Sequence, residues 1–377
     1  MRLVTLLLAG LAALLVHHSA LAAPQPLAII DRSTWPEKID TPVAFDVASR
    51  AEVLTFAHAL SASEALSEAQ LADRLDLRSI NMASINTLRA QLWGRLWRSF
   101  DQAQQSCEQD ASFCFAIDSQ ADLQQQAMAY AIDADSFYAG WATPGAVFAE
   151  AYLDELLHAA ALFPQISSEV LRFSDAERNG DELNDRVFLL TFDGGPTAAQ
   201  GHTDWLTDYL RRQKMSATFF VLGNSFASRR DKPAEQDLQR LYEGQCVGIQ
   251  GWEYRSHSHW QDWQDSIERS VALVQGEVPN NYVPLFRPPY GQRRSDAQPF
   301  FSAQQLQVAL WDIDSQDATG RLTAEQSAQR VLTLMLLWRR GVVVFHDTQD
   351  KAQTAVPWLL TQTAQSGIGW QPCKQFQ

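Results

Sequence analysis

The chain has 377 residues and a formal net charge of −14 at pH 7. This length exceeds one average domain and is sufficient to bury a large hydrophobic core. The negative charge argues against nucleic acid and strongly anionic polymers as partners, whereas a neutral or cationic substrate such as an amino-sugar polymer is compatible with it. The sequence contains neither an internal repeat nor a low-complexity tract.

Residues 1–22 have the pattern of a secretory signal peptide. Arg2 precedes a mostly apolar run from 3 to 16, and small residues at 20 and 22 form a cleavage site. The run is short for a membrane-spanning helix, so cleavage is favoured over the alternative of an uncleaved anchor. No later segment is apolar for long enough to span a bilayer. We therefore expect a secreted or periplasmic protein.

The four cysteines agree with an oxidising compartment. Cys107 and Cys114 enclose a short loop and are predicted to pair, which leaves Cys246 to bridge to Cys373 in the C-terminal tail. Other connectivities are open, so this pairing is a preference. No two cysteines have the spacing that suggests a zinc site.

Residues 23–180 predict an α-helical module. Residues 23 to 45 are punctuated by prolines and read as extended, whereas 46 to 163 show helical periodicity. The clearest apolar stripe has spacings of three and four residues and contains Ile85, Leu88, Leu92, Leu96 and Phe100. The polar run at 174–186 is typical of a linker. The sequence assigns these helices no chemistry.

Residues 181–377 alternate between strands and helices. Predicted strands are 187–192, 217–222, 246–250, 285–287, 308–313 and 341–346. Predicted helices lie near 202–213, 234–243, 261–275, 302–306 and 323–339. This alternation is typical of βαβ units and predicts an α/β fold with a largely parallel sheet or barrel.

Several predicted strands end in polar side chains. The first ends in Asp193, and others end in Arg287, in 314–317 and in His346. Parallel α/β folds place their chemistry at the C-terminal ends of strands. A single such residue is usually structural, but aspartate, arginine and histidine at several strand ends favour one shared site.

These strand ends resemble the motifs of the polysaccharide deacetylase family, also called the NodB-homology domain or carbohydrate esterase family 4, over roughly 185–375. T-F-D-G-G-P at 191–196 is similar to the family's T-F-D-D-G-P, and R-P-P-Y at 287–290 to R-x-P-Y. D-S-Q-D at 314–317 is similar to D-S-x-D-W, with Ala318 in place of Trp, and V-F-H-D at 344–347 to L-x-H. The resemblance implies a distorted (β/α) barrel.

The resemblance also implies a hydrolase of carbon–nitrogen bonds other than peptide bonds. Members remove N-acetyl groups, or in some cases O-acetyl esters, from a glycan polymer, here chitin-like or peptidoglycan-like. Carried over by residue, Asp193 is the general base and His346 the acid that protonates the leaving amine. Arg287 would pair with the base, and Asp317, or alternatively Asp314, would orient His346. Predicted glycan contacts are Tyr290, Pro289 and Trp311.

The family's divalent metal, such as zinc, activates the attacking water and is held by the second Asp of the first motif and two His. Gly194 stands at the Asp position, and no register of 244–260 supplies both His. Aligning the glycines without a gap places Gln250 and Tyr254 there. Two other registers give Arg255 with His259, or Glu253 with His257.

An alternative metal site would use Glu253, His257 and His259. Glu253 and His257 are spaced to share one face of a helical turn, and a carboxylate with two imidazoles is an acceptable zinc ligand set. The other interpretation is that the two histidines are exposed polar residues at a helix start.

Three functional interpretations follow. A metal-dependent deacetylase with rearranged ligands explains why base, acid and both supporting residues are present. A catalytically inactive barrel that binds glycan, or has a structural role, better explains Gly194 and the missing His. A metal-free hydrolase of a more reactive ester ranks third, because only Asp193 would activate its water.

Overall fold

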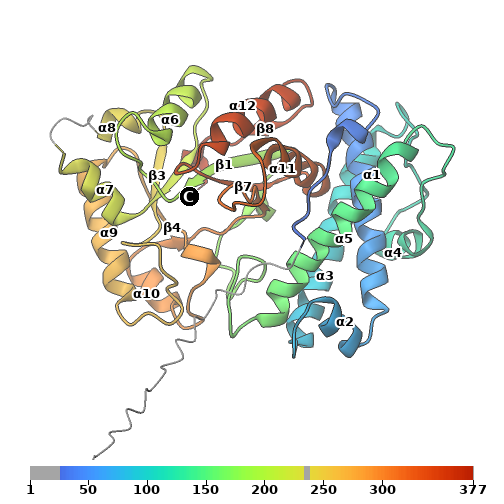
Figure 1. Cartoon of the computed structure of the whole chain (residues 1–377), viewed down its shortest axis with the longest axis horizontal. Coiled ribbons are helices and arrows are strands. Elements are labelled where there is room, and N and C mark those ends of the chain that lie inside the picture. Colours follow the sequence, from blue (N-terminus) through green and yellow to red (C-terminus); the bar gives the residue numbers. More distant parts are fainter. Residues whose placement is uncertain (1–25, 233–237, 377) are drawn as a thin grey trace, which may run out of the picture.

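The structure, a computed structural model, describes residues 26–232 and 238–376 (Figure 1). The predicted signal peptide at 1–22 lies outside the described residues. Within the described ranges, no helix is both long enough and apolar enough to cross a membrane. The N-terminal helices stand together on one side of the molecule, and the sheet with its own helices lies on the other (Figure 1).

The N-terminal helices gather around α1. They are α1 (Pro42–Glu64), α2 (Glu68–Arg74), α3 (Met82–Ala103), α4 (Gln120–Ala129) and α5 (Ala139–Leu162). The predicted stripe lies on α3 and is buried throughout, from Ile85 to Phe100. The side chain of Asn81 caps α3 by accepting a hydrogen bond from the N–H of Ser84. α1 is buried on nearly all sides because α3, α4 and α5 pack around it.

The strands form one sheet in which every pair is parallel, in the order β5-β4-β3-β2-β1-β7-β6. The central strand β1 is mostly apolar, and all its residues after Val187 are buried. The strands are β1 (Val187–Asp193), β2 (Thr218–Val221), β3 (Cys246–Ile249), β4 (Tyr282–Phe286), β5 (Gln307–Val308), β6 (Ile313–Asp314) and β7 (Gly341–His346). The short β8 (Gly369–Trp370) pairs with the start of β1.

The sheet closes into a distorted (β/α) barrel through 307–314. β5 and β6 lie at opposite ends of the strand order but follow each other directly in the chain. Between them, the N–H of Ala309 donates to the carbonyl of Phe286 (2.8 Å), and the N–H of Asp312 donates to that of Val342 (3.0 Å). The strand predicted at 308–313 is therefore two short strands, because the segment changes its partner from β4 to β7.

The helices of the barrel lie between its strands along the chain. They are α6 (His202–Arg212), α7 (Gly223–Arg230), α8 (Leu238–Leu241), α9 (Trp263–Glu277), α10 (Gln298–Ala303), α11 (Ala324–Trp338) and α12 (Lys351–Thr363). The sequence did not predict α7 or α12. α12 contains Pro357, which usually ends a helix. α10 begins and ends earlier than the predicted 302–306.

α11 joins the N-terminal helices to the barrel. It packs against α1, α3 and α12, and its residues from Val331 to Trp338 are all buried. One hydrophobic cluster runs from Phe56 of α1 through Met335 of α11 to Phe192 of β1. Both predicted disulfides, Cys107–Cys114 and Cys246–Cys373, are present. The second ties β3 to the C-terminal turn.

Candidate active site

Asp193 ends β1 with a carboxylate that is held on both oxygens. Oδ1 accepts a hydrogen bond from Arg287 Nη1 at 2.9 Å, and Oδ2 accepts one from Gln250 Nε2 at 2.9 Å. The residue is 3% exposed. Burial raises the pKa of Asp193 above its usual value, and the charge of Arg287 opposes that rise.

Arg287 follows β4 and is fully buried. Besides Asp193, its Nη1 donates to Thr191 Oγ1 at 2.6 Å, and its Nε donates to the carbonyl of Ala309 at 3.2 Å. Thr191 and Asp193 lie two residues apart on one strand, so their side chains leave the same face of the sheet. The guanidinium also stacks over the ring of Phe220, 4.0 Å from its centroid. These contacts fix the cation that holds Asp193.

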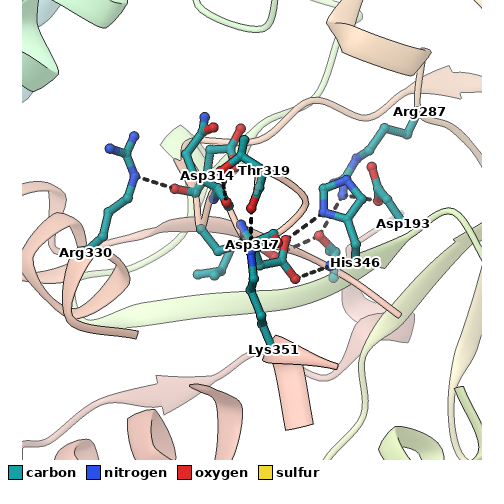
Figure 2. Close-up of polar contacts among 12 residues, drawn as sticks. Asp193, Arg287, Asp314, Asp317, Thr319, Arg330, His346 and Lys351 are labelled. Carbon is teal, nitrogen blue, oxygen red and sulfur yellow. Dashed lines mark hydrogen bonds and ion pairs between the residues drawn. The ribbon is translucent and has the colours of Figure 1, made fainter. Parts of the chain in front are cut away.

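His346 ends β7 and is held by Asp317 at two points. Its Nδ1 lies 2.8 Å from Asp317 Oδ1, and its backbone N–H donates to Oδ2 at 2.9 Å (Figure 2). Burial alone would lower the pKa of His346, but the hydrogen bond and charge of Asp317 outweigh it and raise the pKa to about 9. The imidazole is therefore protonated at neutral pH, as a general acid requires.

Asp317, rather than Asp314, is the carboxylate that contacts His346. Its Oδ1 also accepts a hydrogen bond from Ser315 Oγ at 3.0 Å, and Lys351 Nζ donates to its carbonyl at 2.9 Å (Figure 2). The side chain of Asp314 instead accepts from the N–H of Gln316 at 2.8 Å. The loop after β6 therefore presents one carboxylate to the imidazole.

Asp193 and His346 lie side by side on adjacent strands. β1 and β7 are parallel, and their register pairs the Cα of Asp193 with that of His346. Both side chains line one cavity of about 820 Å³. From the sequence we expected a carboxylate, a guanidinium and an imidazole at several strand ends to share one site. Asp193, Arg287 and His346 are arranged in this way.

Aromatic side chains contribute to the lining of this cavity. Tyr290 and Trp311 line the cavity, and Tyr290 is 46% exposed. Its ring lies 4.6 Å from that of Tyr254. Tyr290 has a φ of 59°, a strained conformation for a residue with a side chain. Pro289 is buried and does not line the cavity.

The residues around Asp193 do not fit the family's metal site. Gly194 has no side chain and a φ of 98°, where any other residue is strained. Of the three registers, the one without a gap places Gln250 at a family His position, and Gln250 is the residue that contacts Asp193. Within 26–232 and 238–376, no three His, Cys, Asp or Glu side chains gather as a metal-holding group.

The alternative ligands Glu253, His257 and His259 do not come together. The prediction that the first two share a helical turn is wrong, because 250–260 is a loop and α9 begins only at Trp263. His257 is 1% exposed, its Nε2 lies 3.1 Å from Ser266 Oγ, and burial lowers its pKa to about 4. His257 is therefore a core residue, whereas Glu253 and His259 are exposed.

Sequence reasoning missed two groups of site residues. Thr191 and Ser315 support the charged pairs, and their positions two residues from Asp193 and Asp317 are the only sequence signal for them. The second group comes from α3 and α5, which line the cavity through Arg95 and other residues. The apolar stripe of α3 indicated a packed face but gave no sign that part of it borders the site.

Comparison with known proteins identifies the class of the barrel. The family model described as polysaccharide deacetylase matches residues 180–309. The chain is 35% identical over 147 residues to the peptidoglycan-N-acetylmuramic acid deacetylase PdaC of Bacillus subtilis, covering 37% of this chain and 28% of that protein. It is 30% identical over 187 residues to the bifunctional xylanase/xylan deacetylase of Cellvibrio japonicus, covering 48% and 26%.

A CE4 family pseudoenzyme from Bacillus anthracis superposes with a TM-score of 0.45 at 18% identity, covering 55% of this chain and 70% of that one. The chain spans about a quarter of the length of the two curated relatives. Residues 180–309 of this chain therefore carry a polysaccharide deacetylase domain.

Proposed function

We propose that the cavity binds an N-acetylated amino-sugar glycan, chitin-like or peptidoglycan-like, and that Asp193 and His346 hydrolyse its acetamide outside the cytoplasm. The observation that carries this proposal is the pairing of a buried carboxylate with a protonated imidazole on adjacent strand ends in one cavity. The name of one relative, a peptidoglycan deacetylase, supports an amino-sugar substrate, whereas the xylan deacetylase supports only removal of acetyl groups from a glycan.

In the proposed reaction, water attacks the acetyl carbonyl carbon and gives a proton to Asp193. A carbon–oxygen bond forms, and the carbonyl electron pair moves onto its oxygen. When this intermediate collapses, the carbon–nitrogen bond breaks and the nitrogen takes a proton from His346 Nε2. The products are acetic acid and a free amine, and return of the proton from Asp193 to His346 through solvent restores the site.

The role of Asp317 in this reaction is to position the acid. It occupies Nδ1 of His346, so the imidazole presents Nε2 to the cavity. Arg287 positions the base in the same way. Because the residues do not fit the family's metal site, the water is activated by Asp193 alone. An amide is a poor electrophile, so slow turnover is expected.

A second candidate function is glycan binding without cleavage. It is favoured by the hydrogen bond from Gln250 to Oδ2 of Asp193, because this donor competes for the oxygen that must accept the proton of water. Gly194 also favours binding without cleavage, because glycine has no side chain that could hold the family's metal.

Acetate release distinguishes the two candidates. Chelator-treated protein is incubated with acetylated chitin oligomers, peptidoglycan and acetylated xylan, with and without added zinc. We expect slow release from the amino-sugar substrates, without dependence on zinc, that is lost in Asp193→Asn and His346→Ala. Binding of oligomers without any release would establish the second candidate. Absence of both binding and release would overturn the proposal.

A further inference from the structure

We propose that the N-terminal helices set the length of glycan that the site accepts, and that Gly94 of α3 is the position that keeps the cavity open. The site would then take a short oligomer or a chain end rather than the interior of a long polymer. The inference that the ligand is a glycan rests on the proposed function. The position of the N-terminal helices beside the cavity comes from the structure alone.

One wall of the cavity comes from the helices, and the barrel supplies another part of its lining. On α3, Gln91, Gly94, Arg95 and Arg98 line it, spaced so that they share one helical face. On the barrel side lie Asp193 and His346. The helices and the charged pair therefore line the same cavity.

Contacts with α11 hold this wall in place. The guanidinium of Arg95 lies over the ring of Trp338, 4.2 Å from its centroid. Ser99 Oγ donates to the carbonyl of Trp338 at 3.3 Å. Arg330 Nη2 of α11 pairs with Glu155 Oε2 of α5 at 2.6 Å, and both side chains are almost fully buried. These contacts oppose a movement of the wall that would admit a longer chain.

Gly94 leaves space where any other residue would project a side chain. Glycine is unfavourable inside a helix, so its presence in the middle of α3 calls for a reason. Tight packing is not that reason, because an added Cβ at Gly94 would meet no atom within 4 Å. The space in front of Gly94 belongs to the cavity.

The size of the cavity points to a short ligand. About 820 Å³ lies within the range of sites that enclose most of a drug-sized molecule. A disaccharide or trisaccharide is such a molecule. A polymer bound through its interior needs an open groove that continues on both sides of the reacting sugar, whereas residues of α3 and α5 add to the lining of this cavity.

The experiment introduces larger side chains at Gly94 so that they occupy the cavity. A second helical glycine outside the cavity serves as the control. Gly276 lies in the last turn of α9, and a Cβ added there also meets nothing within 4 Å, but Gly276 does not line the cavity. The full chain is made as wild type, Gly94→Leu, Gly94→Trp and Gly276→Trp. Calorimetry measures the binding of acetylated chitin oligomers from the disaccharide to the hexasaccharide, alongside acetate release and melting temperature.

We expect the wild type to bind short oligomers and to gain nothing beyond the length that fills the cavity. Gly94→Trp should weaken binding about tenfold or more because its indole occupies the volume that encloses the ligand. Gly94→Leu should have a smaller effect in the same direction and serves as the test if Gly94→Trp does not fold. Gly276→Trp should bind as the wild type does.

Equal affinity in wild type and Gly94→Trp would overturn the inference, as would affinity that keeps rising to the hexasaccharide. Binding that is lost in Gly94→Trp while the wild type releases no acetate would support the inference and contradict the deacetylase. If the wild type binds no oligomer, both proposals fail.

Discussion

Gln250 and Arg287 each occupy one oxygen of Asp193, and this pair of contacts shows what a motif can and cannot predict. The family motifs identified Asp193 and Arg287 because both stand at fixed places in short sequence patterns. Gln250 appeared in only one of three possible registers of the His motif, and its contact with Asp193 comes from the spatial approach of β3 to β1 through β2. The sequence also left Asp314 open as the partner of His346, since only the path of the loop after β6 selects Asp317.

The raised pKa of His346 predicts a measurable titration. In NMR spectra recorded against pH, the His346 ring should titrate near pH 9, and in Asp317→Asn its pKa should be clearly lower, because burial persists and only the weaker charges of Asp193 and Asp314 still oppose it. The folded pKa exceeds the unfolded one, so this interaction stabilises the protein fully below about pH 6.5 and is lost as the pH rises through about 9. A midpoint near 6.5 in both proteins would contradict the proposed role of Asp317.

The ion pair of Arg287 with Asp193 predicts that removing one charge destabilises the protein more than removing both. Arg287→Met leaves the buried carboxylate without its cation, and breaking such a pair from one side costs about 3–5 kcal/mol. Asp193→Asn/Arg287→Met removes both charges and should recover much of that loss. Urea unfolding of the two variants and the wild type measures the free energies. A double variant that is less stable than Arg287→Met would show that the unpaired buried charge does not explain the loss of stability.

At the scale of elements, periodicity predicted those whose pattern arises locally. α3, α5, β1 and β7 were found because burial on one face or along one strand leaves a regular apolar signal. The wrong predictions lie where tertiary contacts override this local apolar signal. α12 continues through Pro357, the strand at 308–313 divides because it changes partner, and the turn expected at 253–257 is a loop that packs His257 into the core.

The two disulfides predict different contributions to stability. Cys246–Cys373 closes a loop with a sequence separation of 127 residues, whereas the separation of Cys107–Cys114 is 7. In the chain-entropy model a longer loop gives more stabilisation, so Cys246→Ser/Cys373→Ser should cost about 4–5 kcal/mol. Cys107→Ser/Cys114→Ser is the matched control and should cost clearly less. Urea unfolding measures both, and equal losses would show that loop length does not decide them.

At the scale of the whole molecule, the sequence predicted two consecutive modules with a boundary near 180, and that division stays a prediction. The helices and the barrel share one hydrophobic core through α11. Buried charges also cross between them: Arg330 pairs with Glu155, and Arg339 Nη2 lies 2.8 Å from Asp46 Oδ1. Such long-range pairs leave no sequence signal, because each partner alone looks like an ordinary charged residue.

This shared core predicts that the barrel depends on the N-terminal helices. A fragment beginning at 181 would expose the face of α11 that α1 covers, and it would leave Arg330 without Glu155. Exposed apolar area promotes association, and an unpaired buried charge destabilises the fold. We expect the fragment to bind a hydrophobic dye and to aggregate on heating, whereas the full chain unfolds in one cooperative transition. Calorimetry and light scattering check both. A soluble fragment that melts at the temperature of the full chain would show instead that the barrel is independent, and that the helices are present only to shape the cavity.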